Sequence, residues 1–432
     1  MSTDSGLRRR LPAGIVDAGF ASLATFAVGL AAVTWFDDVS RGVYAVFFTA
    51  FVAASLLSTE LIYTPAQVKT VSFPTSERLS LVPQTLRLGI GPTSLGTLAV
   101  GGAVAATWSY ASTDVLVPLA VTTAISLVLS PMQDHVRRML HIGAQNWKAS
   151  WISVVQFFVA ISGVAVGYLA DVPIGWIPFG ALAIANAVSL TVGVIVARVS
   201  IQDKADAIMR FRELATRGKW FVLAATARSI ASFVVVTVIA WVVSPEDLGY
   251  AESARVVAQP VLVLAAGLSA VLGPRSMRAA MDRDRATARR TSRLYLGLMG
   301  LGGLTYTLIV AWDVPINPMA HIVPSAYVLP GLVALTIAAN VIASAPFLRS
   351  NELAGAHRER TLAGIAWLSS TVSVVGGLTA WLTGAYARPV SVLGDGASRY
   401  AAQSHVLGTI YATKTSRATT GPTSGTEPTN TA

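Results

Sequence analysis

The chain has no cysteine and few charged residues, and each shortage narrows what it can be. Without any Cys among its 432 residues, it has no disulfide framework, no thiol nucleophile and no thiolate metal site. Charged residues make up 12% of the chain and hydrophobic residues 53%, whereas a soluble domain has about 25% charged residues. This balance predicts an all-α polytopic membrane protein in which apolar helices cross a bilayer.

Signatures of cofactor chemistry are also missing. The five His residues show no metal-ligand spacing with carboxylates. The sequence has no Gly-rich loop ending in Gly-Lys-Ser/Thr that would cradle a phosphate, and no cytoplasmic insertion long enough to hold an ATPase domain. We therefore expect no bound metal, no cofactor, no direct ATP hydrolysis and no enzymatic activity.

The net charge of +10 reflects membrane topology and does not predict a nucleic-acid partner. If the N-terminus lies in the cytoplasm, 27 of the 32 Lys and Arg residues fall in cytoplasmic segments, and two, Arg41 and Arg388, fall in external loops. Such an asymmetry over short loops is the positive-inside pattern. It predicts an even number of spans, with both termini cytoplasmic, in a multi-pass protein of the cytoplasmic membrane.

A run of about 20 apolar residues crosses the hydrocarbon core of a bilayer, and about twelve such runs can be placed. The first continues from the basic Arg8–Arg10 cluster to Phe36, which is too long for a cleaved signal peptide. The last is the most polar, so its status as a full span is left open. The runs cover residues 13–36, 42–65, 90–111, 115–133, 150–170, 174–197, 219–243, 249–273, 294–312, 326–348, 362–384 and 389–411.

The twelve runs divide into two pseudo-symmetric lobes of six. Tyr44-Ala45 at the start of the second run matches Tyr250-Ala251 at the start of the eighth, which indicates a duplicated architecture. Between the lobes, apolar residues recur at helical spacing among charges, which predicts an amphipathic helix on the inner leaflet or a solvated linker helix. The expected segments are a cytoplasmic N-terminus at 1–12, an N-lobe at 13–197, the linker at 198–218, a C-lobe at 219–411 and a disordered cytoplasmic tail at 412–432.

Three arginines, Arg228, Arg255 and Arg399, lie inside runs that are otherwise apolar. A charge at that depth costs at least ~2.5 kcal/mol, so such residues usually face a water-filled path or each other. Helical spacing places three more polar residues on the same faces: Glu252, Gln259 and Asp395. We expect these six residues to line a cationic cavity, built largely by the second half, that binds an anionic group such as a diphosphate, because a guanidinium binds phosphate through two hydrogen bonds.

A second interpretation of the same charges stays open. Arg255 would pair with Glu252 and Arg399 with Asp395, which leaves two structural ion pairs and a single unpaired arginine at position 228. Under this interpretation the residues stabilise the helices and bind no cargo.

Two acidic residues, Asp17 and Glu60, lie near the cytoplasmic ends of the first two runs. They are candidates for a proton or sodium site coupled to transport, although both lie within reach of the lipid headgroups. Gln156, Asn186 and Asn340 are lone polar residues on apolar helices, and we expect them to form hydrogen bonds between helices.

The two halves and three short motifs resemble the multidrug, oligosaccharidyl-lipid and polysaccharide (MOP) flippase superfamily, in particular its polysaccharide or O-antigen flippase branch. The motifs are Gly42-x-Tyr44-Ala45, Gly249-Tyr250-Ala251 and Pro274-Arg275. The resemblance implies a MATE-like fold and alternating access. It also implies that the chain translocates a lipid-linked (poly)saccharide precursor through a cationic cavity that includes Arg228 and Arg255.

The resemblance also implies a set of partners. They are the lipid bilayer and a lipid-linked anionic glycan, with a polysaccharide polymerase and glycosyltransferases as companions and the chain acting as a monomer. Three alternatives differ in class. A major facilitator transporter would carry an Asp-Arg and Gly-Arg/Lys loop after the second span, which is missing. A drug or cation antiporter of the same superfamily would require acidic residues deep in the first half. A membrane glycosyltransferase or polymerase would use Asp37-Asp38, which lie in a very short external loop.

Overall fold

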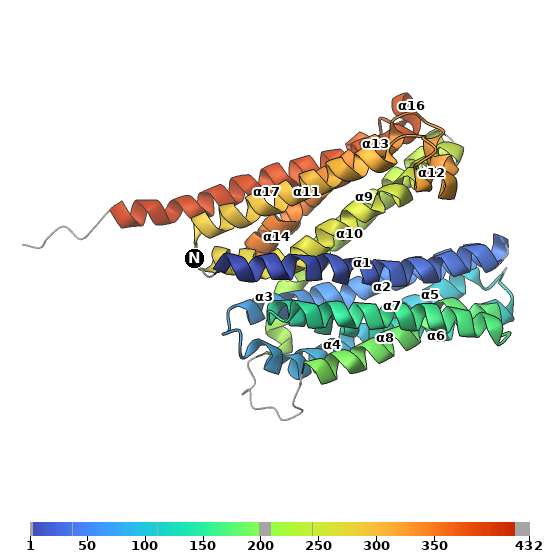
Figure 1. Ribbon diagram of the computed structural model, residues 1–432, viewed down its shortest axis with the longest axis horizontal. Coiled ribbons are helices and arrows are strands. Elements are labelled where there is room, and N and C mark those ends of the chain that lie inside the picture. Colours follow the sequence, from blue (N-terminus) through green and yellow to red (C-terminus); the bar gives the residue numbers. More distant parts are fainter. Residues whose placement is uncertain (1–2, 37, 110, 198–208, 244, 420–432) are drawn as a thin grey trace, which may run out of the picture.

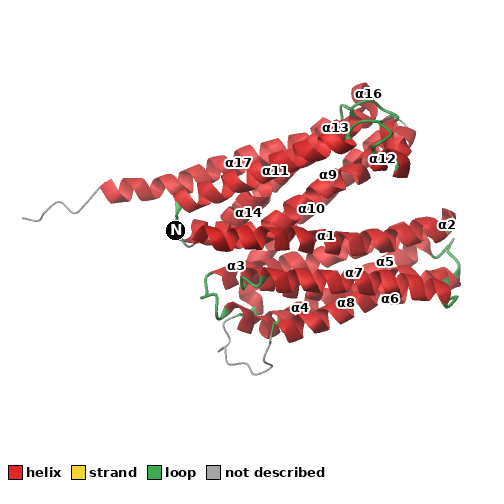
Figure 2. Cartoon of the chain, viewed as in Figure 1, coloured by secondary structure: helices red, strands yellow, loops and turns green. Residues whose placement is uncertain are grey.

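The computed structural model describes residues 3–36, 38–109, 111–197, 209–243 and 245–419, and these form helices joined by turns, without any strand (Figure 2). Apolar runs become helices here because a chain in lipid must satisfy every backbone N–H and C=O within its own segment. The helices fall into two groups, the N-lobe and the C-lobe.

The N-lobe contains six helical units. Its second unit changes from an α-helix to a π-helix at η1 and then continues as α3, and its third unit is divided into α4 and α5. The elements are α1 (Thr3–Trp35), α2 (Asp38–Ser58), η1 (Thr59–Tyr63), α3 (Thr64–Val71), η2 (Arg78–Leu81), α4 (Val82–Gly96), α5 (Leu98–Thr107), α6 (Thr113–Ile142), α7 (Asn146–Leu169), η3 (Ile174–Trp176) and α8 (Ile177–Val196).

The C-lobe also contains six units. Its fourth unit is divided at Pro346 into α13 and α14, because a proline removes a backbone donor and disfavours the helical conformation of the residue before it. The elements are α9 (Phe211–Val242), α10 (Pro245–Met281), α11 (Arg285–Val310), α12 (Pro318–Ile322), η4 (Pro324–Tyr327), α13 (Leu332–Ser344), α14 (Pro346–Gly355), α15 (Glu359–Gly377), α16 (Ala380–Thr383), η5 (Gly384–Tyr386) and α17 (Ala387–Thr419).

The two lobes meet at one end and spread apart at the other (Figure 1). They meet at the end that holds the N-terminus and the C-terminal part of α17. One buried apolar cluster bridges the lobes at this end and includes Val71 of α3, Phe221 of α9 and Met277 of α10. If the N-terminus is cytoplasmic, as the loop charges predict, the closed end of the lobes would face the cytoplasm and the open end would face outward.

Two backbone contacts hold the lobes at close range. Gly14 of α1 and Gly267 of α10 face each other so closely that a Cβ on either residue would collide with the carbonyl oxygen of the other. At the second contact, a Cβ on Gly218 of α9 would collide with the carbonyl oxygen of Leu61 in the π-helical turn η1. Glycine is required at these points because no other residue leaves room for the two backbones.

The helical, multi-pass architecture predicted from the sequence is confirmed. Eight of the described helices are long and apolar enough to cross a membrane, and nine if the bent pair Glu359–Gly377 and Ala380–Ala412 is one span. The twelfth unit, left open above, is part of that pair and forms one long helix, α17. Each lobe has the six units that the sequence predicts.

Two boundaries differ from the expected segments. The expected tail begins at residue 412, but α17 continues to Thr419, and residues 420–432 lie outside the described residues. In the expected linker, residues 198–208 also lie outside them, whereas Phe211 to Gly218 form the first turns of α9. Those turns are part of α9, the first helix of the C-lobe, and they pack on η1 and α3 of the N-lobe. Lys69 of α3 forms a 2.7 Å ion pair with Glu213 across this contact.

Candidate functional site

A pocket of about 310 Å³ opens within the C-lobe between α9, α10, α13, α15 and α17. This volume is at the lower end of the range for small-molecule sites. Its charged lining residues are four arginines and one aspartate: Arg228, Arg255, Arg388, Asp395 and Arg399. The pocket is therefore strongly cationic for a cavity among apolar helices.

Each arginine reaches the pocket from a defined helix. Arg228 comes from the middle of α9 and Arg255 from the first third of α10, and both side chains are exposed. Arg388 lies in the first turn of α17, and Arg399 lies three helical turns further along the same helix. The four charges thus converge on one pocket from three different helices, whereas charges along the exposed face of a single helix would not surround a cavity.

Arg399 is the most constrained of the four. The residue is only 6% exposed. One terminal nitrogen, Nη2, lies 3.2 Å from Asp395 Oδ2 and donates to the carbonyl oxygen of Ala343 at 3.1 Å. The Asp395 and Arg399 side chains still keep one buried atom each, Oδ1 and Nε, without a hydrogen-bond partner.

Arg228 links the pocket to the N-lobe. It interacts electrostatically with Arg399 across the pocket and with Glu60, which lies in the π-helical turn η1 of the N-lobe. Glu60 also accepts a hydrogen bond from Thr64 and interacts with Arg138 of α6. The charge of Arg228 therefore lies where the two lobes meet, so a change in their relative position would change its surroundings.

Neutral polar groups complete the pocket wall. The Ser373 and Ser391 hydroxyls lie 2.7 Å apart, Asn340 donates to the carbonyl oxygen of Ala258 at 3.2 Å, and the buried Ser370 hydroxyl has no partner. The neutral polar residues in the lining are Ser232, Gln259, Thr336, Asn340, Ser370, Ser373 and Ser391. Hydroxyl and amide groups of this kind can donate to and accept from a polyol, whereas arginine can only donate.

The structure brings together five of the six residues predicted for the cavity: Arg228, Arg255, Gln259, Asp395 and Arg399. The sixth, Glu252, lies on α10, but its side chain is outside the described residues. The ion pair between Arg399 and Asp395, which belonged to the alternative interpretation, is also present. Lining a pocket and forming an ion pair are therefore not exclusive for Arg399. The role of these residues in binding cargo stays a prediction.

The sequence analysis did not predict Arg388 as a pocket residue, because it lies just before the last apolar run and was therefore assigned to an external loop. In the structure it is half-buried in the first turn of α17 and lines the pocket. A usable signal was its place eleven residues before Arg399, which is three helical turns and therefore the same face of a helix.

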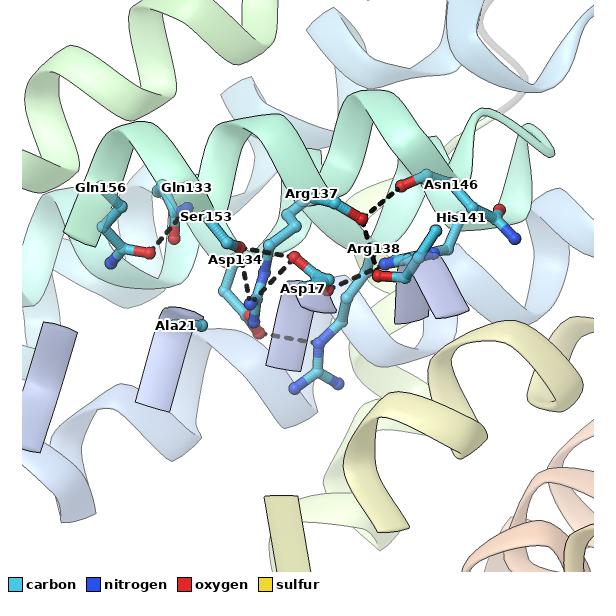
Figure 3. Close-up of polar contacts among 12 residues, drawn as sticks. Asp17, Ala21, Gln133, Asp134, Arg137, Arg138, His141, Asn146, Ser153 and Gln156 are labelled. Carbon is cyan, nitrogen blue, oxygen red and sulfur yellow. Dashed lines mark hydrogen bonds and ion pairs between the residues drawn. The ribbon is translucent and has the colours of Figure 1, made fainter. Parts of the chain in front are cut away.

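A second polar cluster lies inside the N-lobe around Asp17 of α1 (Figure 3). Asp17 is only 3% exposed, and its carboxylate accepts hydrogen bonds from Ser153 of α7 and from Arg137 of α6 at 3.4 Å. His141 Nε2 lies 2.9 Å from the other carboxylate oxygen. Arg137 also pairs with Asp134, one turn earlier on α6. This cluster ties α1 to α6 and α7 by charge-assisted contacts.

The Asp17 cluster corrects two expectations. Asp17 does not extend toward the headgroups, because its carboxylate points into the lobe at Arg137 and His141. Arg137 and Arg138, counted above as cytoplasmic loop residues, lie on α6 and both pair with Asp134, Arg138 Nε at 2.7 Å. A role of Asp17 or Glu60 in ion coupling stays a prediction.

The lone polar residues of the apolar helices form hydrogen bonds between helices, as expected. Gln133 Nε2 of α6 donates to Gln156 Oε1 of α7 at 3.3 Å, and Gln156 Nε2 donates to Asn186 Oδ1 of α8 at 2.7 Å. Asn340 bonds from α13 to α10. Within the part of the chain that is described, no group of three His, Cys, Asp or Glu side chains could hold a metal ion.

No family model matches this sequence, and neither does any curated protein. Solved structures do. The "outward-facing conformation of a multidrug resistance MATE family transporter of the MOP superfamily" is similar over 94% of this chain and 96% of that one, with a TM-score of 0.75 and 13% identity.

Two further solved structures have the same architecture. A "MOP superfamily transporter from Pyrococcus furiosus", for which a "reverse polarity of binding pocket suggests different function", is similar over 96% of both chains, with a TM-score of 0.73 and 13% identity. "MATE in the bent conformation" is similar over 95% of this chain and 97% of that one, with a TM-score of 0.72 and 13% identity. At such identities the likeness shows the fold, and the fold is that of these transporters.

Proposed function

We propose that the chain is a membrane transporter that translocates an anionic, lipid-linked saccharide precursor between the leaflets of the cytoplasmic membrane. The observation that carries the proposal is the composition of the C-lobe pocket, in which four arginines and one aspartate converge. The fold supports the transporter part, since the similar solved structures are transporters. The pocket supports the anionic part.

Arginine suits this cargo because of its geometry and its permanent charge. A guanidinium donates two parallel hydrogen bonds to a phosphate and keeps its proton at any physiological pH. Holding several such groups among apolar helices is unfavourable unless an anion or water faces them. A diphosphate, with its adjacent anionic groups, could accept hydrogen bonds from several of the pocket arginines at once, while Asp395 keeps Arg399 in place.

The neutral part of the wall fits the saccharide. Hydroxyl and amide side chains from five helices stand beside the arginines: Ser232 on α9, Gln259 on α10, Thr336 on α13, Ser370 on α15 and Ser391 on α17. A sugar ring presents hydroxyls that both donate and accept, and these side chains offer the same two functions. The pocket would thus hold the diphosphate and the first sugar, leaving the lipid chain in the bilayer.

Alternating access would move the cargo. The lobes spread outward from the contacts at Gly14–Gly267 and Gly218–Leu61, so closing them outside and opening them inside would expose the pocket to the cytoplasmic leaflet. Arg228 would sense this movement through Glu60 of the N-lobe. Asp17 and Glu60 would then be the residues that couple an ion gradient to the change, since both lie on helices at the lobe contact.

A second candidate function is export of a cationic drug by ion antiport. The fold favours it, because one similar structure is described as a multidrug resistance transporter. The pocket opposes it, because a cation would be repelled by an excess of arginines. The enzyme alternative depended on Asp37-Asp38, whose side chains lie outside the described residues.

The flippase proposal also includes companion proteins. Glycosyltransferases would make the cargo and a polymerase would consume it, and the transporter would act as a monomer.

The proposal is tested by reconstituting the protein in liposomes with a fluorescent polyprenyl-diphosphate-linked disaccharide. Translocation is read as the fraction of fluorophore that becomes accessible to a membrane-impermeant quencher. The proposal predicts faster translocation than in empty liposomes and no effect of the protein on ethidium accumulation in vesicles. Ethidium transport without translocation of the lipid would establish the antiporter instead.

A further inference from the structure

Outside the pocket, two cations from different helices converge on one indole ring at the end of the C-lobe where the lobes meet. Lys219 Nζ of α9 lies 5.2 Å from the ring centroid of Trp220, and Arg360 Cζ of α15 lies 5.7 Å from the same centroid. Both cationic side chains are exposed. Among the described residues, neither of them has a carboxylate partner.

The positions of the two cations are fixed by packing between α9 and α15. Below Trp220, the small residues Ala224, Ala363 and Ala366 form a buried cluster that brings the two helices together. Above it, Arg217 of α9 forms a 3.1 Å hydrogen bond with His357, next to the start of α15. A neighbouring carboxylate, that of Glu359, is buried and lies 3.8 Å from His357. Both positive charges are thus held within 5.7 Å of one ring centroid by contacts that do not neutralise them.

The cluster lies where the polar end of the lobe gives way to its lipid-facing surface. On α9, the exposed face continues from Lys219 to Leu223 and Ile230, and on α15 from Arg360 to Trp367 and Leu368. The positive-inside pattern assigns this end to the cytoplasmic leaflet. Tryptophan at such a boundary sits at headgroup depth, and basic residues there attract anionic lipids.

We propose that Lys219, Trp220 and Arg360 form a binding site for the phosphate of an anionic phospholipid of the cytoplasmic leaflet, such as phosphatidylglycerol. The phosphate lies beside the Trp220 ring, where it pairs with both cations, and the acyl chains follow the exposed apolar faces of α9 and α15. Gly364, one turn beyond Arg360, leaves open space where a side chain would otherwise stand. This site is independent of the cargo pocket.

Native mass spectrometry of the detergent-purified protein tests the site with dioleoylphosphatidylglycerol and dioleoylphosphatidylcholine as probes. Wild type should retain phosphatidylglycerol preferentially, and Lys219→Gln/Arg360→Gln should bind it roughly tenfold more weakly. Lys219→Arg/Arg360→Lys should keep the affinity, because both charges remain. Phosphatidylcholine, which is neutral overall, should bind all variants alike.

The matched control is Lys148→Gln/Arg289→Gln, which removes two exposed cations from α7 and α11. An equal loss of phosphatidylglycerol binding in this control would show that only net charge matters and would overturn the site. Unchanged binding by Lys219→Gln/Arg360→Gln would overturn it as well. If sn-glycerol 3-phosphate raised the melting temperature as much as phosphatidylglycerol does, the ligand of the site would be a soluble phosphate and not a lipid. None of these outcomes depends on which cargo the pocket carries.

Discussion

Asp395 lies one helical turn before Arg399 on α17, with 3.2 Å between Oδ2 and Nη2, in a pocket whose other charged residues are all arginines. This carboxylate offsets part of the repulsion among the four guanidinium groups. It also holds Arg399 at the carbonyl of Ala343, where α17 packs against α13. The pair therefore serves the stability of the C-lobe and the electrostatics of the pocket together.

Asp395→Asn should destabilise the protein, because Arg399 would remain largely buried without its counter-charge. The expected loss is about 3 kcal/mol, the lower end for breaking a buried ion pair. It is measured as a lower melting temperature in detergent. Asp395→Asn combined with Arg399→Gln should recover most of the loss, since no buried charge is then left alone. Equal melting temperatures for wild type and Asp395→Asn would show that water, and not Asp395, solvates Arg399.

Asp17→Asn should weaken the N-lobe in a similar way. Arg137 would keep Asp134 as a partner, so the expected loss is smaller than that for Asp395→Asn. The contacts from α6 and α7 to α1 would be weakened, because neutral hydrogen bonds would replace charge-assisted ones. Limited proteolysis and the melting temperature measure the effect. If Asp17→Asn left the stability unchanged but transport no longer responded to an ion gradient, Asp17 would have a coupling role and not a structural one.

Gly14→Val should disturb the contact between the lobes, because a side chain at this position collides with the carbonyl oxygen of Gly267. We expect a lower melting temperature and greater accessibility of the end at which the lobes meet. Gly19→Val on the same helix is the matched control, since a Cβ there meets no atom within 4 Å. Equal effects of both substitutions would indicate that helix propensity, and not the contact between lobes, is responsible.

Topology can be tested without background labelling, because the chain has no cysteine. Ser76→Cys, in the exposed turn between α3 and η2, should react with a membrane-impermeant maleimide only after the cells are opened. Ile316→Cys should react in intact cells, since Ile316 is 92% exposed at the opposite end of the molecule. The reverse pattern would invert the membrane orientation and move the lipid site of α9 and α15 to the outer leaflet.

The sequence predicts the architecture because apolar runs and loop charges both report on the membrane. It also predicts five of the pocket residues, since charged residues within apolar runs usually face a water-filled path or each other. It fails for Arg137, which looked like a loop residue. A run of hydrophobicity ends at the first charges, whereas α6 continues because Asp17, on a helix distant in sequence, neutralises Arg137.

A repeat in the sequence could have revealed the ion pair between Asp134 and Arg137 in the Asp17 cluster. Pro131 and Pro346 occupy equivalent places in the two halves. Three residues after the first comes the pair Asp134–Arg137, and three residues after the second comes the pair Arg349–Glu352, with the charges exchanged. Each pair spans three residues, which is the spacing of side chains that meet on one helical face. Buried ion pairs in a duplicated chain are thus recognisable when the halves are aligned.

The central claim is that the C-lobe pocket binds a lipid-linked diphosphate, and direct binding tests it most closely. A polyprenyl-diphosphate-linked disaccharide is titrated into wild type, into Arg228→Gln/Arg255→Gln and into the control Lys148→Gln/Arg289→Gln, which has the same net charge. We predict that the pocket variant binds about tenfold or more weakly, since each charge-assisted hydrogen bond contributes about 1.5–3 kcal/mol, and that the control binds like wild type. Equal affinity for all three proteins would contradict the claim.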